Sequence, residues 1–178
     1  MGDKIHLPVL LELEKSGKKY TRCYTPSPHC MPARFSILTG LHPSQMMVTE
    51  NTRASIHEDA PSFARDLGAN GWRTIVIGKT HFKSHDKPGD LNENTKYLSK
   101  LGFSESIEIA GPRGLRRMEC KLTNDWAVRG YLEKQREDLE KRYKQGTSPE
   151  AFEVRPTVLP LDLYPDIWIK NEALKKID

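Results

Sequence analysis

Apolar and polar positions alternate along the chain in stretches that predict short helices and strands. Residues 8–17 begin with a proline and end with a glycine around an apolar and acidic run, which indicates a helix. Residues 18–25 (KKYTRCYT) alternate between two faces and predict a strand. A proline-rich loop then leads to residues 31–40, where Pro32 in the first turn and Gly40 at the end predict a second helix.

The same alternation continues through the middle of the chain. Residues 60–71 predict an amphipathic helix, with Phe63 and Leu67 four positions apart on its apolar face. Residues 72–79 (WRTIVIGK) predict a buried strand that ends in a glycine turn. The remaining predicted elements are loops at 41–59 and 83–94, a helix, turn and strand within 98–111, a long charged helix at 124–145, an irregular loop at 146–162 and a final helix at 164–178.

The order of these elements predicts the fold class. Helices that alternate with strands are typical of an α/β sandwich, in which a mainly parallel sheet is flanked by helices. Only two or three strands are visible in the pattern, which is few for such a sheet. A length of 178 residues is enough for one domain with its own core.

Composition and charge narrow the function classes. The chain is 37% hydrophobic and 29% charged, which is outside the disordered range. Its net charge of +4 permits anionic ligands, but no basic–aromatic alternation accompanies it, so we expect no nucleic-acid partner. No apolar run is long enough to predict a membrane span. The first residues lack the pattern of a signal peptide, which leaves both the cytoplasm and the periplasm open.

Candidate chemistry begins at Cys30. The three cysteines, Cys23, Cys30 and Cys120, do not make a closed disulfide framework, although a single bridge stays open. Cys30 falls at or just before a predicted helix start, where free N–H groups and the helix dipole favour anions and lower the pKa of a thiol. Arg34 lies four residues on, on the same helix face, where its guanidinium can bind an oxyanion. On these features alone, a small buried cysteine is the favoured interpretation, because a cysteine at a helix start is more often a buried residue than a nucleophile.

A second candidate group follows the strand predicted at 72–79. Lys79 and His81 lie at its carboxyl end, where open α/β sheets place their ligand sites. The two residues are two positions apart, so in extended backbone both side chains point the same way. On position alone, a lysine and a histidine that follow a strand are usually residues of a surface loop.

Two strings that contain these residues resemble the signatures of one enzyme family. CMPARFSILTG, from Cys30, resembles the first signature of the type I, formylglycine-dependent sulfatases, and every defined position matches. GWRTIVIGKTHF, from Gly71, resembles the second signature, which ends in Gly-Lys-x-His. Further segments along the whole chain also resemble sulfatase segments. Within the family, GKTHF is most similar to the form found in choline-sulfatase-like bacterial branches. The resemblance implies an alkaline-phosphatase-like α/β fold.

The resemblance also implies an activity, which is hydrolysis of a sulfate ester on a small molecule or a sugar. A maturation enzyme that reads Cys30, Pro32 and Arg34 would convert Cys30 to formylglycine, whose hydrate attacks sulfur and later expels sulfate. Arg34 would then hold the nucleophile, Lys79 would contact the sulfate, and His81 would assist proton transfer. A calcium ion belongs to such sites, and position 30, as formylglycine, is one of its ligands.

Family members also have motifs that this sequence does not contain. The calcium-binding Asp-Asp strand is absent from the first residues, and the other metal ligands of the family would follow residue 178. We therefore expect residues 1–178 to be the amino-terminal part of a sulfatase catalytic domain and to be inactive alone. The alternatives are a phosphonate or phosphate ester hydrolase of the same superfamily, or an inactive sulfatase-like binding protein.

Other polar residues are weaker candidates. Asn51 and Arg53 lie in the loop after the first signature and are expected within reach of substrate. Four further histidines are expected to be loop residues, and these are His29, His42, His57 and His85. His29 is next to Cys30 and is expected at the surface.

Overall fold

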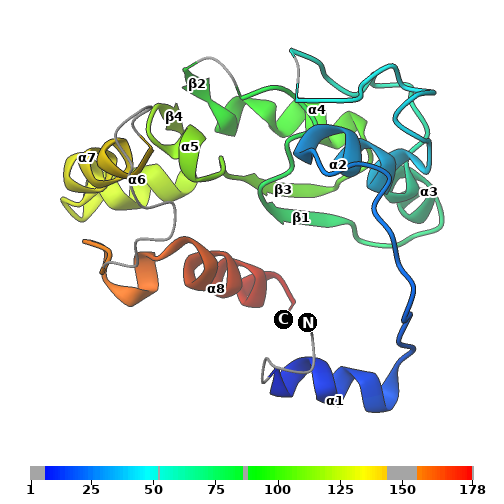
Figure 1. The fold of residues 1–178 in the computed structure, drawn as a ribbon, viewed down its shortest axis with the longest axis horizontal. Coiled ribbons are helices and arrows are strands. Elements are labelled where there is room, and N and C mark those ends of the chain that lie inside the picture. The colour runs from blue at the N-terminus through cyan, green and yellow to red at the C-terminus, as the bar shows by residue number, and fades with distance from the viewer. Residues whose placement is uncertain (1–6, 52, 86–87, 144–155, 178) are drawn as a thin grey trace.

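The structure is a computed structural model that describes residues 7–51, 53–85, 88–143 and 156–177 (Figure 1). Its α-helices are α1 (Pro8–Ser16), α2 (Cys30–Thr39), α3 (Phe63–Ala69), α4 (Thr95–Lys100), α5 (Pro112–Leu115), α6 (Lys121–Val128), α7 (Leu132–Tyr143) and α8 (Pro165–Ile177). Its strands are β1 (Ile75–Gly78), β2 (Gly89–Asp90), β3 (Glu105–Glu108) and β4 (Met118–Glu119). Two 3₁₀ turns are η2 (Leu91–Asn94) and η3 (Leu161–Leu163).

The strands form two small parallel pairs. β1 pairs with β3, with Ile75 opposite Glu105 and Gly78 opposite Glu108, and β2 pairs with β4. The α/β class and the parallel arrangement expected from the sequence are therefore confirmed. The residues of β1 before Gly78 are only half-buried, so the fully buried strand predicted at 72–79 is wrong in that respect.

Buried apolar side chains form two clusters. The first cluster is built around α2, α3 and α4, and its members are Met31, Phe35, Leu38, Ile56, Ala64, Phe82, Leu98, Leu101 and Phe103. The second is built around α5, α6, α7 and α8, and its members are Leu91, Ile109, Ala110, Leu115, Met118, Cys120, Leu122, Trp126, Leu139, Leu159, Leu163 and Trp168. The β1–β3 pair lies between them, because Val76 packs on the first cluster and Ile107 on the second (Figure 1).

Three of the predicted helices are confirmed. α1 and α2 begin and end close to the expected residues, and Gly40 ends α2 in the left-handed conformation at φ 72°. His29, just before α2, has the extended backbone expected of the proline-rich loop. The final helix is confirmed as α8.

The strand predicted at 18–25 is wrong. These residues form bends and coil, and Tyr20 and Tyr24 are 73% and 83% exposed. Alternation is a sufficient signal only where a neighbouring strand can pair, and no described residue pairs with this segment. Figure 1 shows it as the extended connection between α1 and α2.

The long helix predicted at 124–145 is also wrong, because the chain turns at Gly130. Gly130 has φ 75°, and the next amide, on Tyr131, donates back to the carbonyl of Trp126 at 2.8 Å. This turn ends α6, and α7 starts in a new direction at Leu132. The charged face of α7 is nevertheless exposed to solvent, as the sequence pattern indicates.

The apolar face predicted for the helix at 60–71 is wrong. α3 buries Ala64 completely, whereas Phe63 and Leu67 are 48% and 41% exposed. The cause is the close approach of Gly102, at φ 104°, where an added Cβ would overlap the backbone of Arg65. Only a small side chain fits on that side of α3, so the larger apolar residues face outward.

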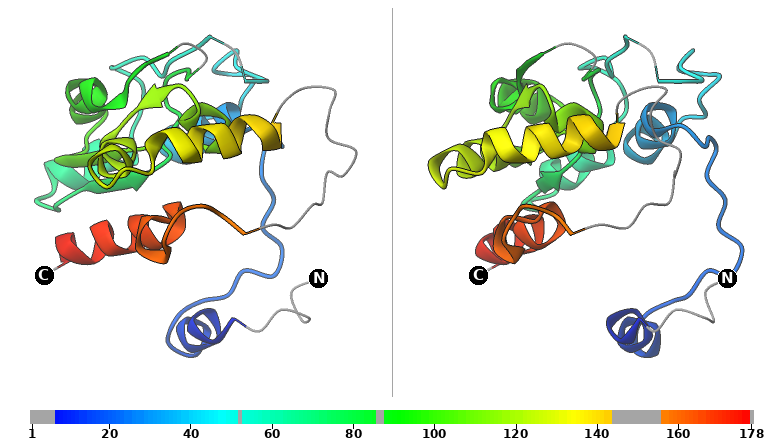
Figure 2. Two further views of the ribbon diagram at one scale, coloured as in Figure 1. Left: turned by 90° about the vertical axis from the view of Figure 1, so that its left-hand side faces the viewer. Right: turned by 60° about the vertical axis from the view of Figure 1, so that its left-hand side comes forward.

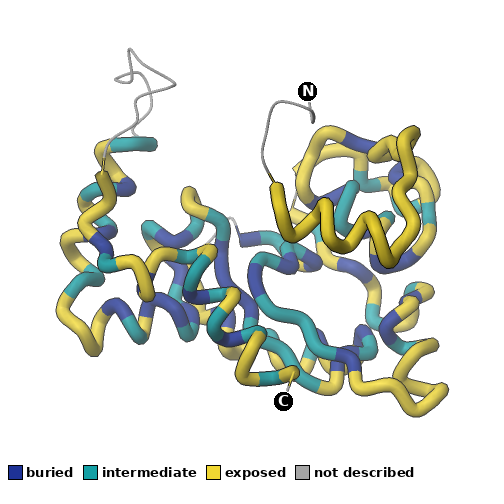
Figure 3. Tube along the Cα trace, turned by 90° about the horizontal axis from the view of Figure 1, so that it is seen from below, coloured by how far each residue is buried: buried dark blue, intermediate teal, exposed yellow. Residues whose placement is uncertain are grey.

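α1 and α8 lie on the underside of the molecule. α1 buries none of its side chains and is exposed along its whole length (Figure 3). α8 lies separately from α1, beneath the other helices (Figure 2), and contacts β1 and η3. Among the residues that the structure describes, no helix combines the length and the apolar character needed to cross a membrane.

Candidate active site

A pocket of about 490 Å³ lies where the two clusters meet. Cys30 and Asn51 reach it from the side of the first cluster, and Lys79 and His81 reach it from the end of β1. The opposite wall comes from the side of the second cluster, and its residues are Gly111, Pro112, Arg113, Gly114, Arg117 and Tyr143, with His85 between the two walls. The structure therefore brings Cys30, Asn51, Lys79 and His81 together, although the sequence separates them by up to 51 residues.

Cys30 is the first residue of α2, as predicted, and its side chain is an exposed free thiol. The start of this helix is fixed by Asn51, whose side-chain Oδ1 accepts from the Met31 amide at 2.9 Å. This contact satisfies one of the free N–H groups at the helix terminus. Asn51 thus lines the pocket and orients the backbone beside Cys30 at the same time.

Lys79 follows β1 directly, and the turn depends on Gly78, which has φ 110°. The Lys79 side chain is half-buried and lies against Gly111, where an added Cβ would be 3.2 Å from its Nζ. Among the described residues its ammonium has neither a carboxylate nor a hydrogen-bond partner. A half-buried cation without a counter-charge is a suitable ligand for an anion.

Arg34 occupies a different place from the other candidates. Its Nη1 donates a hydrogen bond to the backbone carbonyl of Lys79, and Arg34 does not line the pocket. This hydrogen bond therefore connects α2 to the residue that follows β1. This contact fixes the position of Lys79 relative to Cys30.

His81 lies in an unusual local environment. Its backbone has φ 53°, a left-handed conformation that is uncommon outside glycine. Burial, together with the positive charges of Lys79 and Arg34, lowers the pKa of His81 to about 4. Its Nδ1 is buried and has no partner within the described residues. At neutral pH the imidazole is therefore uncharged and can accept a proton.

A buried polar network supports His81 from behind. The His85 ring lies 4.9 Å from the His81 ring, and its Nε2 is 3.2 Å from Oε1 of Glu108. Thr80 donates to the same oxygen, and Asn94 donates to Oε2 at 2.8 Å. Burial raises the pKa of Glu108, but these three hydrogen bonds outweigh it and hold that pKa below its ordinary value. Glu108 is therefore ionised, and a carboxylate that only accepts requires His85 to donate.

His85 is a loop residue, as predicted, but it is buried. His85 is in a loop but is only 8% exposed, because it packs on His81 and bonds to Glu108. The available signal was Glu108 itself, a carboxylate between two isoleucines in a predicted strand, which requires buried partners. His29, His42 and His57 are exposed loop residues, and exposure was the expectation for His29.

Three pocket residues had no signal in the sequence. Arg113 and Arg117 lie in residues 112–123, for which no element was predicted, and Tyr143 lies in the predicted charged helix, yet all three line the pocket with Cys30. Arg53 lines a neighbouring pocket of about 390 Å³ and not this one.

Comparison with known proteins identifies the chain. The family model described as sulfatase matches residues 1–147. The chain belongs to the sulfatase family. It is 36% identical over 115 residues to a choline-sulfatase of Rhizobium meliloti, covering 63% of this chain and 22% of that protein.

Two other sulfatases show a similar degree of likeness. Arylsulfatase K of Xenopus laevis is 30% identical over 124 residues, covering 68% of this chain and 23% of that protein. An N-acetylgalactosamine-6-O-sulfatase of Bacteroides thetaiotaomicron is 29% identical over 133 residues, covering 71% of this chain and 26% of that protein. The present sulfatase chain thus spans about a quarter of the length of these relatives.

The calcium that the sulfatase family implies can be tested against the side chains present. Calcium takes six to eight oxygen ligands, mostly carboxylates and carbonyls. In the part of the sulfatase chain that the structure describes, no group of three or more histidine, cysteine or acidic side chains is arranged to bind a metal. Glu108 is the nearest buried carboxylate behind the pocket, and both of its oxygens are already hydrogen-bonded. The described residues therefore do not make up a calcium site.

Proposed function

We propose that this chain provides the nucleophile and the sulfate-binding wall of a sulfate ester hydrolase. One observation carries the proposal, which is that the half-buried, unpaired ammonium of Lys79 lines the same pocket as Cys30. A sulfate group between them would have its charge balanced by Lys79 and by the amino terminus of α2. The substrate is a sulfated small molecule or sugar.

Cys30 would act after conversion to formylglycine, whose hydrate supplies the attacking hydroxyl group. Lys79 would neutralise charge on the sulfate oxygens as it develops during the attack. Because Lys79 lies against Gly111 and its carbonyl accepts from Arg34, its ammonium is held in place before substrate arrives. Arg34 would therefore act by positioning Lys79 through this hydrogen bond.

His81 would assist proton transfer at position 30. Its pKa of about 4 keeps the imidazole neutral at physiological pH, so one ring nitrogen can accept a hydrogen bond from a hydroxyl at position 30. A protonated imidazole, in contrast, could only donate. Glu108 and His85 would position the ring from behind without contacting substrate.

Maturation would precede folding of this segment. The maturation enzyme is proposed to read Cys30, Pro32 and Arg34, but within α2 Pro32 is fully buried and Arg34 is half-buried. An enzyme can contact all three side chains only while residues 30–34 are extended. A folded chain would therefore be a poor substrate for conversion.

The test is mass analysis of the peptide that contains residue 30. The chain is co-expressed with a formylglycine-generating enzyme, digested and examined for the change from thiol to aldehyde. We expect conversion at Cys30 and none at Cys23, an exposed free thiol seven residues away that serves as an internal control. Arg34→Ala is expected to abolish the conversion. An unmodified thiol at Cys30 in all molecules would contradict the proposal.

A further inference from the structure

We propose that Arg113 and Arg117 form a second anion-binding wall in this pocket, so that the preferred substrates are sulfate esters with another negative charge on the leaving group. The inference rests on the proposed sulfate site at Lys79. It concerns what the rest of the substrate contacts once the sulfate is bound. The chemical class is a sulfate ester that also carries a carboxylate or a further sulfate.

The two arginines are positioned for this role by α5 and the turn after it. Pro112 begins α5 directly after Gly111, the residue against which Lys79 packs. Arg113 lies in α5 and Arg117 lies in the turn between α5 and β4, and both are exposed. Both line the pocket that also contains Lys79.

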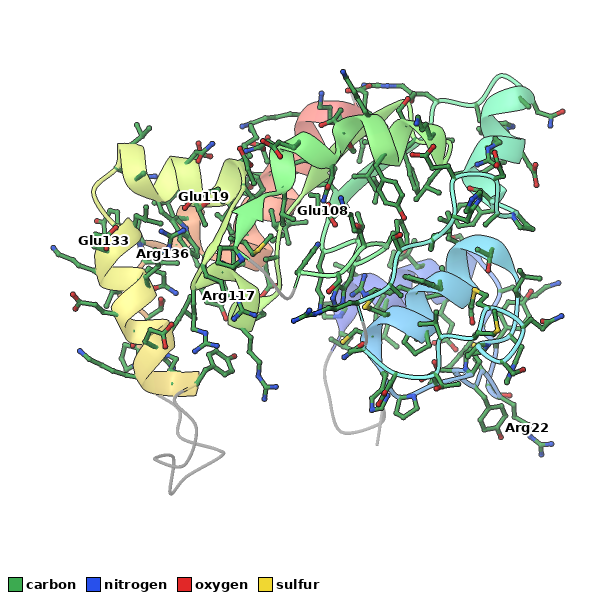
Figure 4. The ribbon with its side chains drawn as sticks, turned by 90° about the horizontal axis from the view of Figure 1, so that it is seen from above. Arg22, Glu108, Arg117, Glu119, Glu133 and Arg136 are labelled. Carbon is green, nitrogen blue, oxygen red and sulfur yellow. The ribbon has the colours of Figure 1, made fainter. Side chains whose placement is uncertain are left out.

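The neighbouring arginines are paired with carboxylates, whereas the pocket arginines are not. Arg116 turns away and binds Glu140, with its Nη1 2.9 Å from the carboxylate. Arg136 likewise binds Glu119, at 2.7 Å. Arg117, near this pair in Figure 4, has no carboxylate partner among the described residues. The segment therefore neutralises the arginines that face away from the pocket and leaves the pocket arginines without a counter-charge.

Arg113 is held by an aromatic ring. Its guanidinium carbon lies 5.7 Å from the centre of the Tyr143 ring, and Tyr143 lines the same pocket. A stacked guanidinium keeps its N–H groups free at the edge of its plane, where they can bind a carboxylate or sulfate with paired hydrogen bonds. The contact therefore restricts Arg113 without using its donors.

The net positive charge of the pocket lining also favours a substrate with two anionic groups. The described lining contains three permanent cations, Lys79, Arg113 and Arg117, and no acidic residue. One sulfate ester carries a single negative charge and cannot balance all three cations. A substrate with a second anionic group is favoured, and a cationic leaving group is repelled.

The experiment compares three aryl sulfates by isothermal titration against the purified 178-residue chain at low ionic strength. The probes are phenyl sulfate, 4-carboxyphenyl sulfate and 4-(trimethylammonio)phenyl sulfate. The test variant is R113Q/R117Q. The matched control is K18Q/R22Q, which removes two exposed positive charges from the segment between α1 and α2, far from Arg117 (Figure 4). A charge-keeping variant, R113K/R117K, controls for loss of folding.

The unaltered chain is expected to bind 4-carboxyphenyl sulfate about three- to tenfold more tightly than phenyl sulfate, because exposed ion pairs are each weak. The cationic probe should bind most weakly. In R113Q/R117Q this preference should disappear while phenyl sulfate still binds, and in K18Q/R22Q and R113K/R117K it should remain.

Two results would overturn the inference in different ways. A preference that persists in R113Q/R117Q, or is absent from the unaltered chain, contradicts the second anion wall and leaves the sulfate site intact. Failure of the unaltered chain to bind phenyl sulfate contradicts the proposed sulfate site itself, and the inference then fails with it.

Discussion

At the scale of single residues, His81 combines two unusual properties. Its φ of 53° is uncommon for a non-glycine residue, and its imidazole stays neutral to about pH 4. Histidine, asparagine and aspartate tolerate left-handed backbone better than other side chains. His81→Asn is therefore a substitution that keeps the backbone and removes only the titrating group.

This substitution should change how stability depends on pH. The pKa of His81 is about 4 in the folded chain and 6.5 ordinarily, so between these values the unfolded state binds the proton and the folded state does not. Stability from this group is present above pH 6.5 and is lost as pH falls toward 4. His81→Asn should reduce the loss of unfolding free energy between these pH values by about 1–2 kcal/mol, since solvent partly screens the ring.

The measurement is urea denaturation of both proteins at about pH 7 and at about pH 4.5. The acidic groups titrate in the same way in both proteins, so their effect on stability cancels when the two are compared. His57→Asn, at an exposed histidine, is the control and should leave the pH dependence unchanged. Equal pH dependence in His81→Asn and the unaltered chain would contradict the neutral state assigned to His81.

The sequence predicted the residues of this site better than their contacts. Cys30, Lys79 and His81 could be proposed because each belongs to a local string, and the structure brings them to one pocket. Their supporting residues could not, because Glu108 reaches His85 only after β3 pairs with β1. Arg113 and Arg117 are similar: only the fold distinguishes them from Arg116, which is paired with Glu140.

At the scale of elements, α2 depends on a residue outside it. The side chain of Asn51 accepts from the Met31 amide, while His29, the residue before the helix, makes no side-chain cap. A cap supplied from a loop 20 residues away replaces the local one. The position of Cys30 is therefore coupled to the loop after α2.

Asn51→Ala should lower the free energy of unfolding by about 1 kcal/mol, since it leaves a helix-terminal N–H without an acceptor. Asn51→Asp keeps an acceptor oxygen and should retain the stability. It should nevertheless weaken phenyl sulfate binding, because it adds a negative charge to the pocket. Thermal unfolding followed by circular dichroism measures the first effect, and isothermal titration measures the second. Equal stability of Asn51→Ala and the unaltered chain would exclude a capping role.

The helices were predicted more reliably than the strands for a physical reason. A helix such as α2 makes its hydrogen bonds within itself, so proline and glycine at its ends are informative. A strand requires a partner, which is why residues 18–25 alternate without forming one. The break at Gly130 and the reversed face of α3 follow from turns and close contacts that periodicity does not encode.

At the scale of the whole molecule, α8 connects the second cluster to the β1–β3 pair. Trp168 is buried in the second cluster, and its Nε1 donates to Asp125 of α6 at 2.8 Å. At the other end of the helix, Lys176 binds Glu105 of β3 at 2.6 Å. The pocket forms where the two clusters meet, so α8 contributes to the site without contacting it.

Trp168→Phe should cost about 1 kcal/mol of unfolding free energy, because it removes one hydrogen bond and retains most of the apolar volume. Trp168→Ala should cost about 3–5 kcal/mol, because it also leaves a cavity. Leu174→Ala, at an exposed position of the same helix, is the control and should have little effect. Urea denaturation followed by far-ultraviolet circular dichroism measures all three. A similar cost for Trp168→Ala and Leu174→Ala would contradict the anchoring role of Trp168.

The two-cluster architecture has a consequence for spectroscopy. Of the three tryptophans, Trp126 and Trp168 belong to the second cluster, and Trp72 is 67% exposed. The first cluster, which supports Cys30, contains phenylalanine but no tryptophan. Intrinsic fluorescence therefore reports on the half of the molecule that carries the arginines. If the halves loosen separately, the emission can remain native while the environment of the nucleophile is already lost.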